Sequence, residues 1–381
     1  MRFGTLALAD AGGAILAHSV ATPSGTLRKG MLLDDAAIER IRAAGIAAVV
    51  AAKLDLGDVG EDEAALRLAE ALAGPGIRVE TPATGRCNLF ASAAGLLEVD
   101  AVTVDAINRV DPALTIATRP PLRAAEAGRM VATVKVIPFA VPRDALDAAV
   151  EIARTGLGPV LSVRPFTVRA VAVVSTLLPS LKRSVVDKTV KVLADRLAPA
   201  DARIAADVRV PHDPAALAAA VAEAARTFDL VVVFGASAVV DAADVIPAAV
   251  EAAGGAVIHF GMPVDPGNLL VLGRVAGTPV IGAPGCARSP RENGFDFVLD
   301  RVLAGRMPSA ADIMGMGVGG LLMDIVSRPA PRTGEAMRED PDAPRIAAVI
   351  LAAGRSIRFG DANKLLATVD GEPLVRRAAR A

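Results

Sequence analysis

The chain has 381 residues, of which 53% are hydrophobic, and its 41 Lys and Arg residues balance 42 Asp and Glu residues. At about 150 residues per domain this length predicts two or three domains. The net charge of -1 excludes a global field that would attract nucleic acid or an anionic membrane. Cys87 and Cys286 lie far apart without a nearby Cys or His partner, which excludes a disulfide framework and a structural zinc site.

The start of the chain lacks the charged segment, continuous apolar run and small-residue cleavage pattern of a signal peptide. No apolar run reaches the roughly 20 residues that cross a bilayer, because Gly, Pro or a charged residue interrupts each one. We therefore expect a cytoplasmic protein that has neither a membrane nor a nucleic acid as a partner.

The first 166 residues mix helix and strand patterns, and we divide them into an N-terminal α+β segment (1–95) and a middle α+β segment (96–166). Asp34 is a suitable N-cap for a helix over 35–44, and Gly45 ends that helix. The other expected elements are strands over 13–19, 46–52 and 130–136 and helices over 60–73 and 143–155.

Strands and helices alternate regularly in the next part of the chain. Strands are expected over 168–175, 202–210, 230–234, 256–260 and 279–282, and helices over 185–197, 214–226, 242–253 and 292–303. This alternation predicts right-handed crossovers and an α/β fold, a three-layer mostly parallel sheet spanning 167–328. A stretch rich in Pro, Arg, Asp and Glu over 329–345 indicates a linker.

Three loops of this α/β part leave strand ends and are rich in Gly or Pro. The first is Gly235, Ala236 and Ser237, where Gly235 permits close backbone approach to an anion. The others are Pro266, Gly267 and Asn268, and Pro284, Gly285, Arg288 and Ser289. Since ligands of open α/β sheets bind at the carboxyl ends of the strands, the three loops are expected to line one pocket.

Charged residues near these loops each have two interpretations. Asp241 and Asp244 could orient a ligand or a metal ion, but either could equally cap the helix that follows. Arg288 and Arg291 suit a phosphate group, but could also be solvated residues before the next helix.

The order of these loops resembles the molybdopterin-binding domain shared by molybdopterin adenylyltransferases and molybdotransferases. The resemblance covers roughly 168–305. A weaker resemblance, to the basic turn and helix found upstream in molybdotransferases, covers 30–45. It implies that the loops bind molybdopterin through its terminal phosphate or an attached nucleotide. It also implies that Asp241 and Asp244 are catalytic and handle a divalent cation or molybdate. The metal ligands themselves stay unassigned.

The chain departs from the family pattern at three places in these loops. Ala236 stands where a second glycine is usual, Asn268 where a lysine is usual, and Cys286-Ala287 where Asn-Pro is usual. These departures keep open a non-catalytic carrier or storage module that serves molybdenum hydroxylases. A pyridine-nucleotide processing enzyme with the same domain is a further alternative, because a fold does not fix a function.

The last residues, 346–381, start with a strand-like run and resemble the opening of molybdenum cofactor cytidylyl- and guanylyltransferases. A glycine loop with nearby basic residues suits a triphosphate. The residues that carry the resemblance and the implied nucleotide contacts are Leu351, Ala352, Ala353, Gly354, Ser356, Arg358 and Lys364. The rest of such a domain is not present in these residues, so we expect this nucleotidyltransferase part to be truncated.

Together the two resemblances imply a role in molybdenum cofactor biosynthesis or maturation, coupled in full length to cytidylyl or guanylyl transfer. The expected ligands are molybdopterin, CTP or GTP, and Mg2+. A molybdenum hydroxylase apoenzyme is a candidate partner, and a homodimer is possible by the same resemblance.

Overall fold

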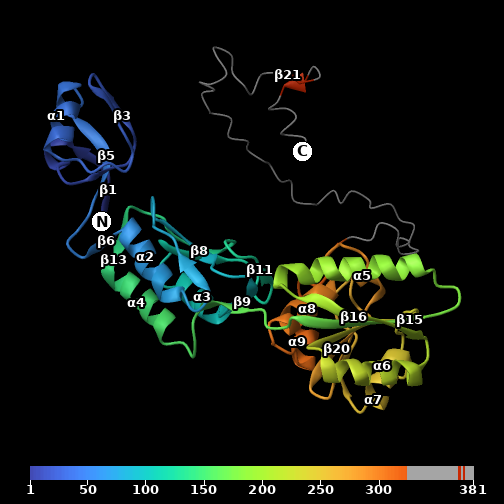
Figure 1. Cartoon of the computed structure of the whole chain (residues 1–381). Helices are drawn as coiled ribbons and strands as arrows, with labels where there is room; N and C mark the ends of the chain where they lie inside the picture. The colour runs from blue at the N-terminus through green and yellow to red at the C-terminus, as the bar shows by residue number, and fades with distance from the viewer. Residues whose placement is uncertain (324–367, 370–371, 374–381) are drawn as a thin grey trace, which may run out of the picture. The chain divides into compact units, whose positions relative to one another are not determined.

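The computed structural model describes residues 1–323, 368–369 and 372–373 (Figure 1). The chain separates into two compact units, Met1–Asp324 and Ile325–Ala381. In the second unit, the described residues form an antiparallel pair of β21 (Thr368–Val369) and β22 (Glu372–Pro373). The linker predicted over 329–345 lies outside the described residues, as does most of 346–381.

The first 53 residues of the larger unit form a small sheet and a helix with their own core. The elements are β1 (Arg2–Ala7), β2 (Ile15–Leu16), β3 (Val20–Thr22), β4 (Gly25–Leu27), α1 (Asp35–Ala43) and β5 (Ala48–Lys53). The sheet order is β1-β5-β2, all antiparallel, and β3 pairs with β4. The helix prediction is confirmed, because the Asp34 carboxylate accepts a hydrogen bond from the Ala37 amide at 2.8 Å.

A second core brings together residues between Val59 and Leu161, including Leu68, Leu89 and Leu146. The elements are β6 (Asp58–Gly60), α2 (Glu61–Leu72), β7 (Ile77–Val79), β8 (Arg86–Ala91), β9 (Gly95–Val99), α3 (Ala101–Asn108), β10 (Leu114–Thr118), β11 (Ala124–Ala125), β12 (Met130–Val136), β13 (Ala140–Pro142), α4 (Arg143–Arg154) and β14 (Leu161–Pro165). The two larger sheets run β10-β12-β8-β7 and β11-β9-β14. The domain boundaries after residues 95 and 166 stay predictions.

The α/β part is built on one six-stranded sheet in the order β16-β15-β17-β20-β19-β18. The first four of these strands are parallel, and β19 and β18 are antiparallel, so the prediction of a mostly parallel sheet is confirmed. The strands are β15 (Ala170–Leu177), β16 (Arg203–Pro211), β17 (Leu230–Phe234), β18 (Ala256–Phe260), β19 (Val271–Val275) and β20 (Thr278–Ala283).

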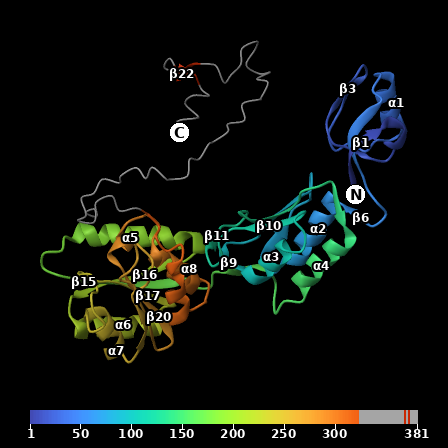
Figure 2. The same ribbon diagram turned by 180° about the vertical axis from the view of Figure 1, so that it is seen from behind.

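Helices cover both faces of this sheet, which gives the expected three layers. In Figures 1 and 2, α5 (Arg183–Leu197) lies above the sheet, and α6 (Pro214–Thr227) and α7 (Val245–Ala252) lie below it. The core on the α5 side also contains α8 (Gly294–Leu303), whose Phe295 is fully buried. The unit ends with the short α9 (Ala310–Met314). Over the described residues, no helix is long and apolar enough to cross a membrane.

Several strands escaped prediction, including β1, β19 and most strands of the second core. In β1 the side chains alternate between exposed and half-buried, and Phe3 is exposed, so the sequence lacks an apolar face. In β19 the pair Gly273 and Arg274 interrupts the apolar run. The helix expected from residue 242 begins at Val245, because residues 235–244 form a loop before it.

Candidate functional site

The parallel strands β15, β17 and β20 end at the same edge of the sheet. From β15 the chain passes through α5 to β16 on one side, and then returns through α6 to β17 on the other side. The strand order therefore reverses between β15 and β17. In open α/β sheets, a crevice forms at such a reversal and is the usual place for a ligand.

A cavity of about 220 Å³, which we call the strand-end pocket, lies at this edge. Its walls come from the segments that follow β15, β17 and β20. The lining residues are Leu181, Val185, Gly235, Ala236, Ser237, Ala238, Val239, Ala283, Pro284, Gly285 and Arg288. Two of the three predicted loops thus meet in one pocket.

Arg288 is the charged residue of the strand-end pocket. Its Nη1 donates to Thr189 Oγ1 at 2.9 Å and its Nη2 donates to the Gly235 carbonyl at 2.8 Å. The guanidinium also lies 5.4 Å from the ring centre of Phe234. Among the described residues no carboxylate pairs with it, and burial lowers the pKa of Arg288. A half-buried cation without a counter-ion is suited to hold an anionic ligand.

The turn after β17 is held close to the neighbouring strand. The Ala236 amide donates to Thr176 Oγ1 at 2.7 Å, and the same hydroxyl contacts His212 Nδ1 at 2.8 Å. A Cβ at Gly235 would lie 2.7 Å from the Ser237 carbonyl oxygen, so a larger residue would displace the turn. The sequence marked Gly235 but not Thr176, whose partner lies 60 residues away.

Arg196, on α5, fixes the loop that carries Arg288. Its guanidinium donates to Asp296 Oδ1 at 2.6 Å and to the carbonyl oxygens of Ala287 at 2.8 Å and Ser289 at 2.7 Å. The side chain is almost buried. Sequence reasoning missed this residue, because nothing in its helical pattern marks a contact about 90 to 100 residues away.

The third predicted loop lies elsewhere. Pro266 and Gly267 pack against α8, where a Cβ on Gly267 would lie 2.7 Å from the Gly294 Cα. Asn268 donates to the Met262 carbonyl at 3.3 Å. Ser289 accepts the Arg291 amide at 3.3 Å. None of these four predicted residues lines the strand-end pocket.

The two predicted catalytic carboxylates organise the loop before α7. Asp244 is the N-cap of that helix and accepts the Val245 amide at 2.6 Å and the Val240 amide at 3.1 Å. Asp241 accepts the Ala243 amide at 2.8 Å. Neither lines the strand-end pocket. Over the described residues no group of three or more His, Cys, Asp or Glu side chains could hold a metal ion.

In the structure Cys87 and Cys286 are both free thiols. Burial raises the pKa of Cys87 to about 11 and raises the pKa of Cys286. Both side chains are therefore held as neutral thiols at neutral pH. The residues predicted to bind nucleotide lie outside the described part of the chain: Leu351, Ala352, Ala353, Gly354, Ser356, Arg358 and Lys364.

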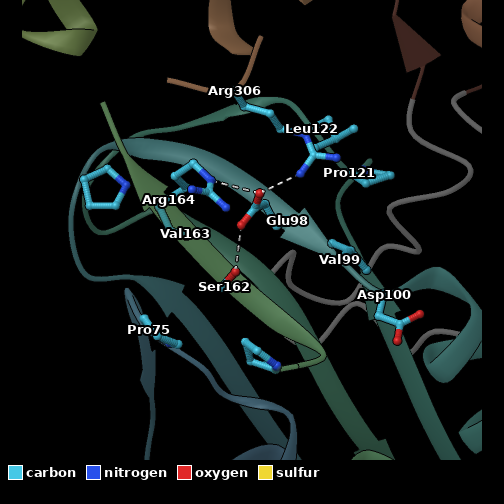
Figure 3. Close-up of a pocket in the computed structure, with 12 residues that line it drawn as sticks. Pro75, Glu98, Val99, Asp100, Pro121, Leu122, Ser162, Val163, Arg164 and Arg306 are labelled. Carbon is cyan, nitrogen blue, oxygen red and sulfur yellow. Dashed lines mark hydrogen bonds and ion pairs between the residues drawn. The ribbon is translucent and has the colours of Figure 1, made fainter. Parts of the chain in front are cut away.

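A larger cavity of about 730 Å³, the junction cavity, lies between the strands β9 and β14 and Arg306, just beyond α8. Figure 3 shows Glu98 at its centre. The carboxylate accepts hydrogen bonds from Ser162 Oγ at 3.3 Å, Arg164 Nε at 3.0 Å and Arg306 Nη1 at 3.2 Å. Both guanidinium groups are engaged by this one carboxylate, which favours a structural link over a ligand site.

Comparison with known proteins finds two family models that match parts of the chain. Residues 170–304 match the family model described as a probable molybdopterin binding domain, and residues 348–381 match the model of a MobA-like NTP transferase domain. No curated protein matches the chain.

Solved structures that match include a molybdopterin biosynthesis moea protein from Pyrococcus horikosii. It has 14% sequence identity and a TM-score of 0.27, and the match covers 80% of this chain and 75% of that chain. A molybdenum cofactor biosynthesis protein from Pyrococcus furiosus has 11% sequence identity and a TM-score of 0.23, and the match covers 82% of this chain and 65% of that chain.

The matched range 170–304 begins at the first residue of β15 and ends just after α8, so it contains the whole six-stranded sheet and the strand-end pocket. The chain therefore combines a molybdopterin-binding domain of the molybdenum cofactor biosynthesis family, at residues 170–304, with a MobA-like NTP transferase stretch at residues 348–381.

Proposed function

We propose that the strand-end pocket binds the terminal phosphate of molybdopterin, or the phosphates of its nucleotide form. The observation that carries the proposal is the Arg288 guanidinium, half-buried in this pocket and without a carboxylate partner among the described residues. A guanidinium fork suits a phosphate group. At about 220 Å³ the pocket is smaller than ordinary ligand sites of about 300–1,000 Å³. It therefore suits the phosphate end, with the pterin outside it.

Titration of the full chain with molybdopterin, followed by pterin fluorescence, tests this function. We expect saturable binding with a Kd of about 1 µM or lower, weakened by inorganic phosphate as a competitor. A folded sample that binds no molybdopterin would contradict the proposal.

In full length, we propose, pterin binding is coupled to transfer of a cytidylyl or guanylyl group with Mg2+. The match of residues 348–381 to a MobA-like NTP transferase domain supports this coupling. The test is turnover of CTP against GTP by the protein that contains the whole domain, with and without Mg2+. A preference for one nucleotide identifies the transferred group. If the protein turns over neither CTP nor GTP, the proposed coupling is wrong.

A second candidate function is a carrier that holds the cofactor and delivers it to a molybdenum hydroxylase apoenzyme. The favouring observation is that the Asp241 and Asp244 carboxylates both accept backbone amides of their own loop. Groups engaged in this way act as caps rather than as acids or bases.

Asp241→Asn tests whether Asp241 is catalytic. Asn can accept the Ala243 amide as Asp does, so a purely structural Asp241 predicts a change in unfolding free energy below about 0.5 kcal/mol and unchanged pterin binding and turnover. A catalytic Asp241 predicts loss of turnover at unchanged stability. The measurements are urea unfolding and turnover of the same preparation.

A further inference from the structure

Arg301, on α8, is a buried cation that forms no ion pair within the described part of the chain. The residue is only 8% exposed, yet among the described residues it makes one side-chain hydrogen bond, from Nη1 to the Phe297 carbonyl at 2.5 Å. Its Nε is buried without a partner among the described residues, and no described carboxylate forms an ion pair with it. An unpaired buried charge is costly, so such a group normally meets an anion or moves its pKa.

A second arginine with an unmet donor lies beside it. Arg123 stacks on the Phe297 ring, with its guanidinium carbon 3.6 Å from the ring centre, and pairs through Nη2 with Glu292. Its Nη1 is buried without a partner among the described residues. Burial lowers the pKa of Arg301, Asp300 raises it, and the charge of Arg123 lowers it further, so the two cations lie within range of one another. Two neighbouring guanidinium groups, each with a buried donor that lacks a partner, call for an acceptor such as an oxyanion.

Both arginines line a cavity of about 650 Å³, which we call the arginine pocket. This volume falls within the range of ordinary small-molecule sites, about 300–1,000 Å³. Apart from the two arginines and Asp312, its walls are apolar or small. They are formed by Pro120, Pro121, Leu122, Phe297, Ala311, Gly315, Met316, Val318, Gly319 and Leu322.

The acids closest to the arginine pocket are engaged elsewhere. Asp312 accepts the Ser309 amide and hydroxyl, both at 2.8 Å, as the capping box of α9. Asp300 accepts the Ala124 amide at 3.1 Å, and burial raises its pKa to about 6. Their charges partly offset the effect of burial on the pKa of Arg301, but neither carboxylate forms a hydrogen bond or an ion pair with its guanidinium.

We propose that the arginine pocket is a second ligand site, distinct from the strand-end pocket, which takes a small organic oxyanion. The oxyanion, a carboxylate or a phosphate, would lie against Arg301 and Arg123. The apolar body of the ligand would pack on Leu122, Phe297 and Met316.

The chemistry of the walls selects this ligand class. Inorganic phosphate would satisfy the arginines but leave the apolar walls uncovered, and an uncharged apolar molecule would leave the arginines unmet. A bidentate oxyanion on an aromatic or aliphatic body satisfies both requirements.

The test uses the full chain with the substitution Arg288→Gln, so that the strand-end pocket does not contribute to binding. This protein is titrated separately with phenyl phosphate, benzoate and inorganic phosphate, and calorimetry measures the binding. We expect phenyl phosphate or benzoate to bind at least about tenfold more tightly than inorganic phosphate. The tighter of the two identifies the oxyanion.

Two further substitutions locate the site. Arg301→Gln removes the buried charge and should weaken binding about tenfold or more. Val318→Glu places a carboxylate at a fully exposed position of the pocket wall, so it should repel the probe without disturbing the fold. Leu157→Glu, fully exposed in a loop away from the pocket, is the matched control and should leave binding unchanged.

Absence of binding at about 10 mM of all three probes would overturn the proposal and leave water as the partner of the two arginines. Equal binding by the Arg288→Gln protein and by the same protein with Arg301→Gln or Val318→Glu added would overturn it as well. Neither result bears on pterin binding, because Arg288 is absent from every protein in the series.

Discussion

At the scale of single residues, Arg196 links the outer helix α5 to the loop that carries Arg288. Four acceptors, the Asp296 carboxylate and the carbonyls of Ala287, Ser289 and Arg291, surround its guanidinium. Buried, charge-assisted hydrogen bonds of this kind are strong, and removing one partner leaves the others unsatisfied.

Arg196→Met should therefore lower the free energy of unfolding by on the order of 3 kcal/mol, which denaturant unfolding measures. Hydrogen exchange of the amides over 285–291 should rise, and molybdopterin binding should weaken because Arg288 loses its support. Arg203→Met, at an exposed residue of β16, is the control. Unchanged exchange over 285–291 would show that Arg196 does not hold this loop.

Asp300 makes stability depend on pH. Burial raises its pKa from 3.8 to about 6, Asp296 raises it too, and Arg123 and Arg301 partly oppose the shift. Because the folded pKa lies above the unfolded one, the native state binds more protons between these values. Stability that is present below about pH 4 is therefore lost as the pH rises through about 6.

Asp300→Asn stays neutral and retains an acceptor for the Ala124 amide. The difference in unfolding free energy between Asp300→Asn and the parent protein should grow in favour of the variant by on the order of 1–2 kcal/mol from about pH 4 to pH 7. Urea unfolding at the two pH values measures this difference. Asp201→Asn, at an exposed turn, is the control. An equal difference in unfolding free energy between Asp300→Asn and the parent protein at both pH values would show that the pKa of Asp300 is not raised in the native state.

At the scale of elements, α1 depends on its cap. Asp34→Ala removes the hydrogen bond to the Ala37 amide and should cost about 1 kcal/mol of unfolding free energy. Asp35→Ala is the matched control, since that side chain adds only a helix-dipole contribution of about 0.3–1 kcal/mol. Equal losses for the two variants, measured by denaturant unfolding, would contradict the capping role.

Elements with a strong local pattern were predicted from the sequence, whereas several other strands were not. The strands over 130–136 and 230–234 were predicted with the bounds that the structure shows, because each has a clear pattern of apolar or β-branched residues. The strands β1 and β19 were missed, because the exposed Phe3 and the pair Gly273-Arg274 break any apolar face.

The candidate site was predictable to the same extent. Glycine and proline marked the turns at 235–237 and 284–288, which meet in the strand-end pocket. The loop at 266–268 carries a similar pattern but packs on α8, because Gly267 serves a close contact with Gly294. The supports Thr176 and Arg196 depend on long-range contacts, which no local pattern encodes.

At the scale of the whole molecule, one sheet brings the ends of β15, β17 and β20 together, and α5 supplies the contacts that orient Arg288. Segments that are separate in the sequence thus form one anion-suited pocket. The central claim is that this pocket holds the phosphate end of molybdopterin through Arg288.

The most direct test compares molybdopterin binding by the parent protein, Arg288→Gln and Arg291→Gln, with pterin fluorescence as the readout. Arg291 is exposed and only three residues away in the chain, so it controls for the loss of one positive charge. We predict that Arg288→Gln weakens binding about 10- to 100-fold, whereas Arg291→Gln changes it by less than about twofold. Equal binding by the Arg288→Gln and Arg291→Gln proteins would contradict the account.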